Sequence, residues 1–473
     1  MSEISKLEPQ KVWEIFDLIC SIPHISKHEA ALAEKLMALA KDAGLQVIQD
    51  ETGNVIIKRP AAKGFENAEP VILQAHLDMV PASTGDFDFI NCAITPRITG
   101  EWVMATNTTL GSDDGIGVAQ AMAIVLDKDF QCGPLTVILT VDEEAGMSGA
   151  ANLAPEHLQG RYLLNLDGSD NGFCIGCAGG ARQEITFTPE YEPAVTGQAV
   201  KITVDGLPGG HSGLCIHENR GNALKIMAEF LEQNDIRIAS FNGGTADNAI
   251  AYFAEAVGIS GKKVAELQAA ADAYTLLTRA ELPAAKNLVI RVEAISDAPQ
   301  KVWQKTFAAD LLSAMMLVPN EVIDFDDELD IVKTSSNLAT IRTYDDKIVI
   351  RTSQRSLVDS DREKISETIA AHFRLFNGKS EMGDVYPATP PEMDSQLLQT
   401  AVKCAGNLQK NATPYAIHAG LESGWFSRKN PALEIISCGP EHHDYHTPEE
   451  KLNIASVARF DTFLRQLIRM LAE

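Results

Sequence analysis

Apolar runs of strand length alternate with helical patterns along the first part of the chain. Three runs are apolar or β-branched at nearly every position: 71–75, 135–141 and 162–166. Helical spacing of apolar residues covers three further segments: Lys11–Cys20, Glu29–Ala43 and Ile116–Leu126. Continuously apolar strands are typical of parallel sheets whose two faces are covered by helices. The pattern therefore predicts an α/β fold with a mixed, largely parallel sheet.

The middle of the chain mixes shorter strand and helix patterns. Strand patterns occur at Val200–Val204 and Lys347–Arg351. Helical patterns follow them, around Leu224–Met227 and over Arg362–Phe373, so the second half of this segment repeats the order of the first. The chain closes with an amphipathic helix over residues 454–471.

His76 and Asp78 stand two positions apart where the first apolar run ends. Side chains at positions i and i+2 of a strand point to the same face. An imidazole and a carboxylate that emerge together suit a metal-binding histidine whose second ring nitrogen is held by a carboxylate. A core histidine with an acidic neighbour is the alternative, and this pair alone does not decide.

Four later segments carry further acids and histidines. Asp113 and Asp114 open the helical pattern near residue 116, where helix capping is the alternative for at least one of them. Three acids, Asp142–Glu144, end the second apolar run, and Asp167 ends the third. A histidine-rich segment, 441–450, precedes the closing helix. Adjacent carboxylates at the end of a buried strand repel one another, which favours a bound cation.

The chemical types of the candidate ligands indicate which cation the site would bind. Carboxylates and imidazoles without thiolates suit Zn2+, Mn2+ or Co2+ in a catalytic site. The acids are too many for one tetrahedral ion, whereas two ions that share a bridging aspartate would use them all and could activate water. Glu143 and Glu144 fit such a two-ion site. Adjacent strand residues face opposite ways, so one can bind metal while the other acts as base.

The spacing of these segments also predicts the domain organisation. They occur before about residue 183 and again after residue 418, yet their side chains must meet in one site. A chain of 473 residues is too long for one ordinary core. We therefore predict a discontinuous catalytic domain, residues 1–183 and 385–473, and an inserted lid domain, residues 184–384.

Five short motifs occur in the order seen in the M20 family of metallopeptidases. They are 76–81, 111–115, 143–146, 165–167 and 446–448. Within that family the chain most resembles the bacterial aminoacyl-histidine dipeptidase group (Xaa-His dipeptidases, carnosinase-like), and the resemblance spans the whole chain. Each motif alone is weakly specific, but five in order are strongly specific. The resemblance implies two Zn2+ per chain, for which Co2+ or Mn2+ can substitute.

The resemblance also implies a role for each matched residue. The implied metal ligands are His76 and Asp167 for one ion, Glu144 and His446 for the other, and Asp113 as the bridge. Asp78 orients His76, and Glu143 is the base that activates water and later protonates the leaving nitrogen. Asp114 becomes a helix-capping neighbour, although spacing alone does not choose between it and Asp113. His442 and His443 are expected to be loop residues.

Substrate-binding residues are expected in the lid. His211, in the glycine-flanked segment 209–213, matches a family histidine that stabilises the oxyanion of the tetrahedral intermediate. A turn histidine without a role is the alternative. Asn242 and Asn248 match polar lid positions that bind substrate.

The chain departs from the family pattern around Asn248. Relatives of this type read Arg-Asn-Ala-Ile-Pro, whereas this chain has Asp247 in place of the arginine and Ala251 in place of the proline. The change argues against carboxylate binding at position 247. Arg355 remains a candidate clamp for the substrate carboxylate, with a solvated strand-edge arginine as the alternative. Glu422 is a candidate for recognition of the substrate amine.

Bulk properties exclude several functions. The formal net charge of −25 and the lack of a basic segment argue against nucleic-acid binding. The start of the chain lacks signal-peptide features, and no apolar run approaches the roughly 18–20 residues of a membrane span. The eight scattered cysteines are typical of reduced thiols. We expect a cytoplasmic protein without a nucleic-acid or membrane partner.

The predicted activity is metal-dependent hydrolysis of dipeptides with a free amino terminus, Xaa-His dipeptides among a broader set, by di-metal-activated water with Glu143 as base. A small peptide is thus the expected partner. A deacylase of N-acyl amino acids on the same scaffold is one alternative, and a catalytically inactive metal-site binding protein is another.

The size of the insertion leaves the assembly open. It is roughly twice as long as one small α/β lid requires. Two stacked α/β units would let His211 act within its own chain. Alternatively the lid dimerises and His211 serves the neighbouring chain, and we favour this homodimer.

Overall fold

The computed structural model describes residues 2–406 and 411–473. The chain divides into two compact units. Unit 1 comprises Met1–Cys177, Thr389–Ala416 and Leu421–Glu473, and unit 2 comprises Ala178–Ala388 and Ile417–Gly420. Unit 2 thus begins a few residues before the predicted lid, because strand β9 (Gly179–Phe187) pairs along its length with two other strands of unit 2.

An eight-stranded sheet forms the centre of unit 1, in the order β1-β2-β6-β3-β7-β21-β8-β20. The middle strands β6, β3, β7 and β21 run parallel, whereas β1, β2 and β8 pair antiparallel with their neighbours. The strands are β1 Gln46–Gln49, β2 Val55–Arg59, β3 Val71–His76, β6 Leu135–Thr140, β7 Tyr162–Asn165, β8 Phe173–Cys177, β20 Pro414–Ile417 and β21 Glu434–Ser437. The three apolar runs form β3, β6 and β7, so the prediction of an α/β fold with a mixed sheet is confirmed.

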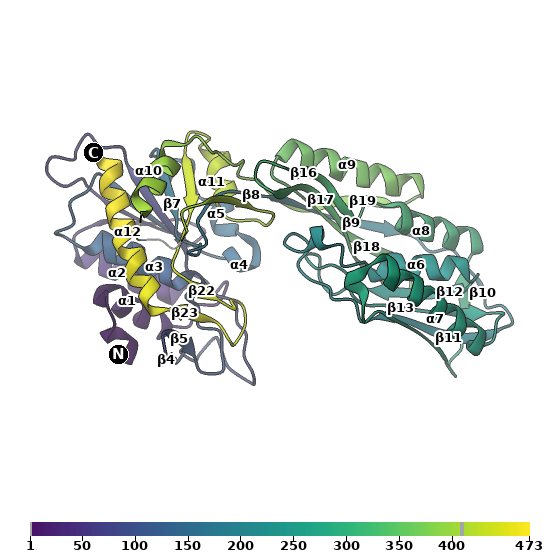
Figure 1. Ribbon diagram of the computed structural model, residues 1–473. Helices are drawn as coiled ribbons and strands as arrows, with labels where there is room; N and C mark the ends of the chain where they lie inside the picture. The colour runs from purple at the N-terminus through teal and green to yellow at the C-terminus, as the bar shows by residue number, and fades with distance from the viewer. Residues whose placement is uncertain (1, 407–410) are drawn as a thin grey trace. The chain divides into compact units, whose positions relative to one another are not determined.

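Both faces of this sheet are covered by helices, as continuously apolar strands require. Along β3, Leu73 packs into the larger core and Ile72 into a smaller core on the opposite face. The larger core lies against α1 Gln10–Cys20, α2 Ala30–Asp42, α3 Ser112–Leu126, α10 Gln396–Ala405 and α12 Ile454–Ala472. The smaller core contains residues of α5 Ser148–Asn152 and α11 Ser423–Lys429. The closing helix α12 packs beside α10 (Figure 1).

A four-stranded sheet completes unit 1, in the order β22-β23-β5-β4. Its strands are β4 Pro96–Thr99, β5 Trp102–Ala105, β22 His442–His443 and β23 Lys451–Asn453. His442 and His443 therefore form a short strand and not the predicted loop, because they pair with Leu452 and Lys451. The loop between β22 and β23 carries His446.

Unit 2 is built on one nine-stranded sheet. Its order is β14-β11-β13-β12-β17-β18-β9-β19, with β16 also paired to β17. The strands besides β9 are β11 Gln198–Asp205, β12 Arg237–Gly243, β13 Ala254–Ser260, β14 Val289–Ala294, β16 Glu321–Asp326, β17 Ile331–Thr343, β18 Ile348–Ser356 and β19 Lys379–Tyr386. A two-stranded sheet joins β10 Tyr191–Pro193 to β15 Lys301–Trp303.

The two halves of the insertion lie side by side in this sheet and are not stacked. The long strand β17 pairs with β12 at Gly243↔Ile341 and so connects the halves. One core contains residues of the helices of both halves. These helices are α6 Ala223–Gln233, α7 Val264–Glu281, α8 Lys305–Leu317 and α9 Asp359–Leu375. Among the helices of residues 2–406 and 411–473, none has the length and apolar character needed to cross a membrane.

We predict that Leu467→Ala lowers the free energy of unfolding of unit 1 by about 2–5 kcal/mol, because Leu467 is a fully buried residue of α12. The neighbouring Gln466 is exposed, so Gln466→Ala should change the free energy by no more than about 0.5 kcal/mol. Denaturant unfolding of both variants measures the difference. Equal destabilisation by the two changes would contradict the assigned helix face.

Candidate metal centre

His76 is the last residue of β3 and is almost fully buried. Its Nδ1–H donates a hydrogen bond of 3.0 Å to the backbone carbonyl of Asp78, whereas the Asp78 carboxylate lies 3.5 Å away. The main chain of Asp78 thus makes the closer contact with the ring. Nε2 lies 3.2 Å from Oδ1 of Asp113. Burial lowers the pKa of His76, but its hydrogen bonds to Asp113 and Asp78 raise the pKa well above the usual value.

The Asp78 carboxylate holds the segment that follows β6. It accepts hydrogen bonds from the backbone N–H groups of Glu143 at 3.0 Å and Glu144 at 3.1 Å. Ser26 donates a third through its hydroxyl, at 2.8 Å. Burial by itself raises the pKa of Asp78, but its interactions with His76, Ser26 and the Glu143 amide lower the pKa to about 2. Asp78 is therefore held as an anion that joins two segments of the site.

Glu143 and Glu144 begin the short helix α4, Glu143–Gly146. The prediction that they continue a strand is wrong, because β6 ends at Thr140 and Asp142 turns the chain with a φ of 60°. Successive helical residues are rotated by about 100°, so the two side chains still point in different directions. Asp142 instead accepts a hydrogen bond from Ser148 and is not among the residues grouped below.

Asp113 lies between the two histidines of the site. Its Oδ1 is 3.2 Å from Nε2 of His76, and its Oδ2 is 3.2 Å from Nε2 of His446. Asp113 and Asp114 have non-helical backbone angles at the start of α3. Asp114 accepts the N–H of His76 at 3.2 Å. A Cβ at Gly117 would collide with the Asp114 carboxylate, which explains the glycine there.

His446 comes from the loop between β22 and β23. Its Nε2 lies 2.9 Å from Oε1 of Glu144 as well as 3.2 Å from Asp113. Hydrogen bonds to these two acids raise the pKa of His446 to about 10. The side chain is 47% exposed, so this edge of the site is open to solvent.

The donors fall into overlapping groups whose candidate ligand atoms lie within 4.8 Å of one another. The groups are His76–Asp113–Asp167, Asp113–Glu144–His446 and His76–Glu143–Glu144. The first two share Asp113. Burial, followed by repulsion from neighbouring acids, raises the pKa of Asp167 and of Glu143 well above their usual values, although His76 opposes the rise. The four acids of these groups outnumber the two histidines, and the oxygen and nitrogen donors fit divalent metal ions.

Glu422 lies beneath this cluster as the residue that precedes α11. It is 1% exposed, and its Oε2 accepts hydrogen bonds from Gln74 at 2.6 Å and Thr140 at 2.7 Å. Burial raises the pKa of Glu422 to about 7, although His76 and both hydrogen bonds act against the rise. Its other oxygen, Oε1, has no hydrogen-bond partner within the described residues. The acid is therefore a buried part of the strand-end cluster.

Arg355 lies in unit 2 on β18, between β17 and β9. It is 7% exposed, so the alternative of a solvated strand-edge arginine is wrong. Its guanidinium donates to the hydroxyl of Tyr386 at 2.7 Å and lies 3.4 Å from Nε2 of His211. The neighbouring His418 bonds to Ser335 at 2.7 Å, and burial followed by the Arg355 charge lowers its pKa to about 3.

His211 is held by the backbone of its own loop. The N–H groups of Gly213 and Leu214 both donate to Nδ1, at 3.3 and 3.1 Å. Burial, followed by the charge of Arg355, lowers the pKa of His211 to about 4. Arg355 also directs an N–H at Nε2, at 3.4 Å, so both ring nitrogens of His211 face hydrogen-bond donors. His211 is thus neutral over the physiological pH range.

The two asparagines differ in their surroundings. Asn248 lines a small cavity of unit 2 together with Arg355 and Tyr386. Asp247 lines the same cavity and forms an ion pair with Arg351 at 3.7 Å. Asn242 instead accepts the N–H of Thr343 between two strands. Across the sheet, Asn242 lies level with a residue of β18 that is six positions from Arg355. Six positions of a strand span roughly 20 Å, so the structure does not group Asn242 with Arg355.

The sequence analysis assigned no role to several residues that form hydrogen bonds with the candidate site residues or lie next to them. They are Gln74, Tyr386, His418 and Glu450. Gln74 shares its strand face with His76 because it lies two residues earlier, and this signal could have been used. Tyr386, His418 and Glu450 are brought to their partners only by the tertiary fold.

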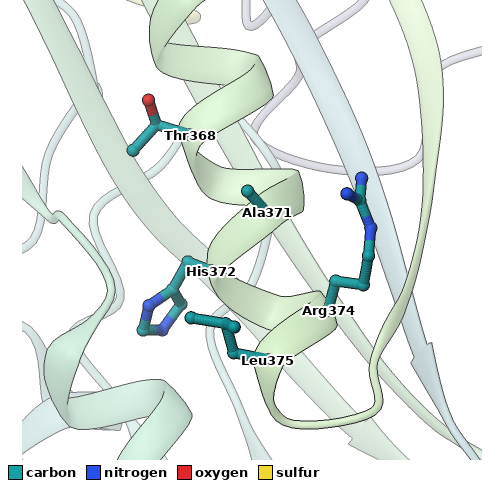
Figure 2. A pocket seen from close by; sticks show the side chains of 5 residues that line it. All are labelled: Thr368, Ala371, His372, Arg374 and Leu375. Atoms are coloured by element: carbon teal, nitrogen blue, oxygen red, sulfur yellow. The ribbon is translucent and has the colours of Figure 1, made fainter.

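The groove drawn in Figure 2 carries no comparable chemistry. It lies on one side of α9 and is lined by Thr368, Ala371, His372, Arg374 and Leu375. The imidazole of His372 bonds to the backbone carbonyl of Ala314 at 2.8 Å, and its ring packs against Phe373 and Phe376. His372 is therefore a structural residue.

Known proteins resemble the chain over nearly its full length. It is 38% identical to the cytosol non-specific dipeptidase of Escherichia coli K12 over 482 residues, which cover 99% of both proteins. The crystal structure of aminoacylhistidine dipeptidase from Vibrio alginolyticus is 37% identical, covers 99% of this chain and 98% of its own, and gives a TM-score of 0.87. Aminopeptidase PepT from Bacillus cereus, at 17% identity and a TM-score of 0.57 over 99% of this chain and 100% of its own, shares the fold.

A family match agrees with these relatives. Residues 72–470, which contain each of the proposed metal-binding residues, match peptidase family M20/M25/M40. The match covers well over half of the chain. The chain belongs to peptidase family M20/M25/M40.

Proposed function

We propose that this protein is a metal-dependent dipeptidase that hydrolyses dipeptides with a free amino terminus, Xaa-His dipeptides among a broader set. The carrying observation is Asp113, whose two carboxylate oxygens face different histidines at 3.2 Å. The names of the two most similar proteins reported above, a non-specific dipeptidase and an aminoacylhistidine dipeptidase, support the substrate class. We propose a cytoplasmic location on the same basis.

The proposed ligands are those grouped around Asp113. His76 and Asp167 would hold one ion, Glu144 and His446 the other, and Asp113 would bridge them. We propose Zn2+ as the ion, with Co2+ or Mn2+ as substitutes. Two such ions lower the pKa of bound water and polarise the substrate carbonyl. Asp78 keeps the His76 ring and the Glu143–Glu144 segment in register for this arrangement.

Glu143 is the proposed proton carrier. It belongs to the group with His76 and Glu144 but is not needed in the two groups that share Asp113. Burial raises its pKa well above the usual value; His76 acts against the rise, and Asp167 and Glu144 add to it. As a carboxylate Glu143 would accept a proton from water, and the acid so formed would deliver it to the leaving nitrogen.

His211 is the proposed donor to the developing oxyanion. Two backbone amides donate to Nδ1, so we propose that the ring proton lies on Nε2 once the substrate displaces the longer Arg355 contact of 3.4 Å. Arg355, with Asn248 lining the same cavity, is proposed to bind the substrate carboxylate. We further propose that unit 2 mediates a homodimer, and whether His211 serves its own chain or its neighbour is tested below.

Glu143→Gln should lower kcat by a factor of about 10²–10⁴, because the amide cannot accept the proton of water. Metal content should stay at two ions per chain, since Glu143 is not a proposed ligand. Steady-state kinetics and metal analysis on the same sample measure both quantities. A variant with full turnover would show that another residue is the base.

His211→Ala should lower kcat more than it changes KM, because the partner charge of His211 develops only in the transition state. The loss should be the same at pH 6 and at pH 8, since the pKa of His211 is about 4 and the ring is neutral at both values. His211→Gln retains an N–H donor and should recover part of the rate. The exposed His217 of the same segment supplies a control, His217→Ala.

The same variants test the assembly. If His211 acts across a homodimer, mixing the His211→Ala and Glu143→Gln proteins under exchange conditions restores activity in the mixed dimer. No recovery in a dimer shown to exchange would place His211 in its own chain. A rise in KM with unchanged kcat for His211→Ala would show that the proposed role is wrong.

A substrate panel tests the proposed function itself. The metal-loaded protein should hydrolyse free dipeptides, including Xaa-His, and should lose this activity on chelation and regain it with Zn2+, Co2+ or Mn2+. N-acetylated amino acids should be poor substrates, because the amine is proposed to be recognised. Turnover of acylated amino acids without turnover of dipeptides would favour a deacylase. No hydrolysis after reconstitution with all three metals would favour an inactive binding protein.

A further inference from the structure

Glu450 is a buried acid that lies four residues after His446. It is 2% exposed, and both of its oxygens accept hydrogen bonds from the segment that leads into α3. Oε2 accepts from the N–H groups of Leu110 at 2.7 Å and Gly111 at 3.0 Å. Oε1 accepts from the N–H and the hydroxyl of Ser112 at 2.7 and 2.6 Å, and from the N–H of Asp113 at 3.3 Å.

These donors are ones that the segment cannot satisfy by itself. The first N–H groups of a helix have no acceptor within the helix and carry partial positive charge. Gly111 has a φ of 71°, a left-handed conformation that favours glycine and turns the amides on either side toward one point. A carboxylate suits that point because it has only acceptors, and hydrogen bonds to an ionised group are the strong ones.

The bonds of Glu450 join two ligand-bearing segments that are distant in sequence. Asp113 is the last residue whose N–H binds Glu450, and its own carboxylate faces both histidines of the centre. On the other side, the N–H of Glu450 closes a turn with the carbonyl of Thr447 at 3.1 Å, directly after His446. Strand β23 begins at the next residue, Lys451, and pairs with β5. His446 is half exposed, so this anchored turn is a main restraint on its position.

We propose that Glu450 is a positioning residue of the metal centre: its carboxylate fixes the backbone of the bridging Asp113 relative to the loop of His446. The inference rests on the proposed function for its ligand assignment. Glu450 itself touches neither metal nor substrate in this proposal. It acts by holding two ligands, one from each end of the chain, at the separation that an ion pair requires.

The test compares Glu450→Gln with Glu449→Gln in the full-length protein. Glu449 is the exposed neighbour, so both variants lose one negative charge at nearly the same place, and only Glu450→Gln alters the hydrogen bonds. The glutamine NH2 group would face backbone N–H groups that need an acceptor. Titration of the apo-protein with Co2+ alone, followed by visible absorption, reports the affinity and the coordination geometry of each ion.

We expect Glu450→Gln to weaken binding of at least one Co2+ by about 10–100-fold and to change the cobalt spectrum, as loss of an outer hydrogen bond does in other metal sites. Glu449→Gln should match the unsubstituted chain. A folded Glu450→Gln protein with unchanged affinity and spectrum would overturn the proposal, even if its apo form melted at a lower temperature, since Glu450 would then be a helix cap alone.

Two further measurements keep the test decisive. If Glu450→Gln does not fold, Ser112→Ala removes the hydroxyl that donates to Oε1 while the carboxylate remains. Weaker Co2+ binding by this folded variant supports the proposal, and unchanged binding overturns it. The titration contains no peptide, so its outcome is independent of the substrate panel: a protein that hydrolyses no dipeptide yet loses Co2+ affinity on Glu450→Gln refutes the function and retains the positioning role.

Discussion

The arrangement of unit 1 depends on one constraint: several acids are buried together at the edge where the parallel strands end. Asp113 stands at the centre, with His76 and His446 each 3.2 Å from a different oxygen. Burial and mutual repulsion raise the pKa of Asp167 and Glu143, and the charge of the nearby His76 offsets this rise only in part. In the proposed function a pair of divalent ions would compensate the excess of negative charge. The cost of gathering these acids is therefore the best physical indication of what the site binds.

A second set of acids binds the backbone of the segments that carry the candidate metal ligands. Asp78 accepts the amides of Glu143 and Glu144, Asp114 accepts the amide of His76, and Glu450 accepts the amides that lead to Asp113. Each of these carboxylates thus holds the backbone of a different ligand segment. Hydrogen bonds of this kind fix the main chain, so the ligand side chains have few rotatable bonds left with which to depart from the required geometry.

Unit 2 contributes donors instead of acids. Its central strand β18 carries Arg355, and the loop of His211 is pinned by its own amides. Burial and the Arg355 charge keep His211 neutral. A neutral donor and a fixed guanidinium complement an anionic transition state and a substrate carboxylate. In the proposed function, unit 2 would therefore supply the hydrogen-bond donors and unit 1 the metal-binding acids.

The sequence by itself determined several strands and helices and the residue types of the candidate centre. Apolar periodicity and strand-end chemistry are local, so β3, β6, β7 and α12 could be predicted from neighbouring residues. Prediction from the sequence failed where distant segments of the chain meet. Four features depend on residues that are distant in sequence, in some cases by several hundred positions. They are the turn at Asp142 that places Glu143 on a helix, the interior position of Arg355, the burial of Glu422 and the hydrogen bond between Glu450 and Asp113. Only the tertiary structure decides such contacts, because no local pattern encodes which buried donor a distant carboxylate will meet.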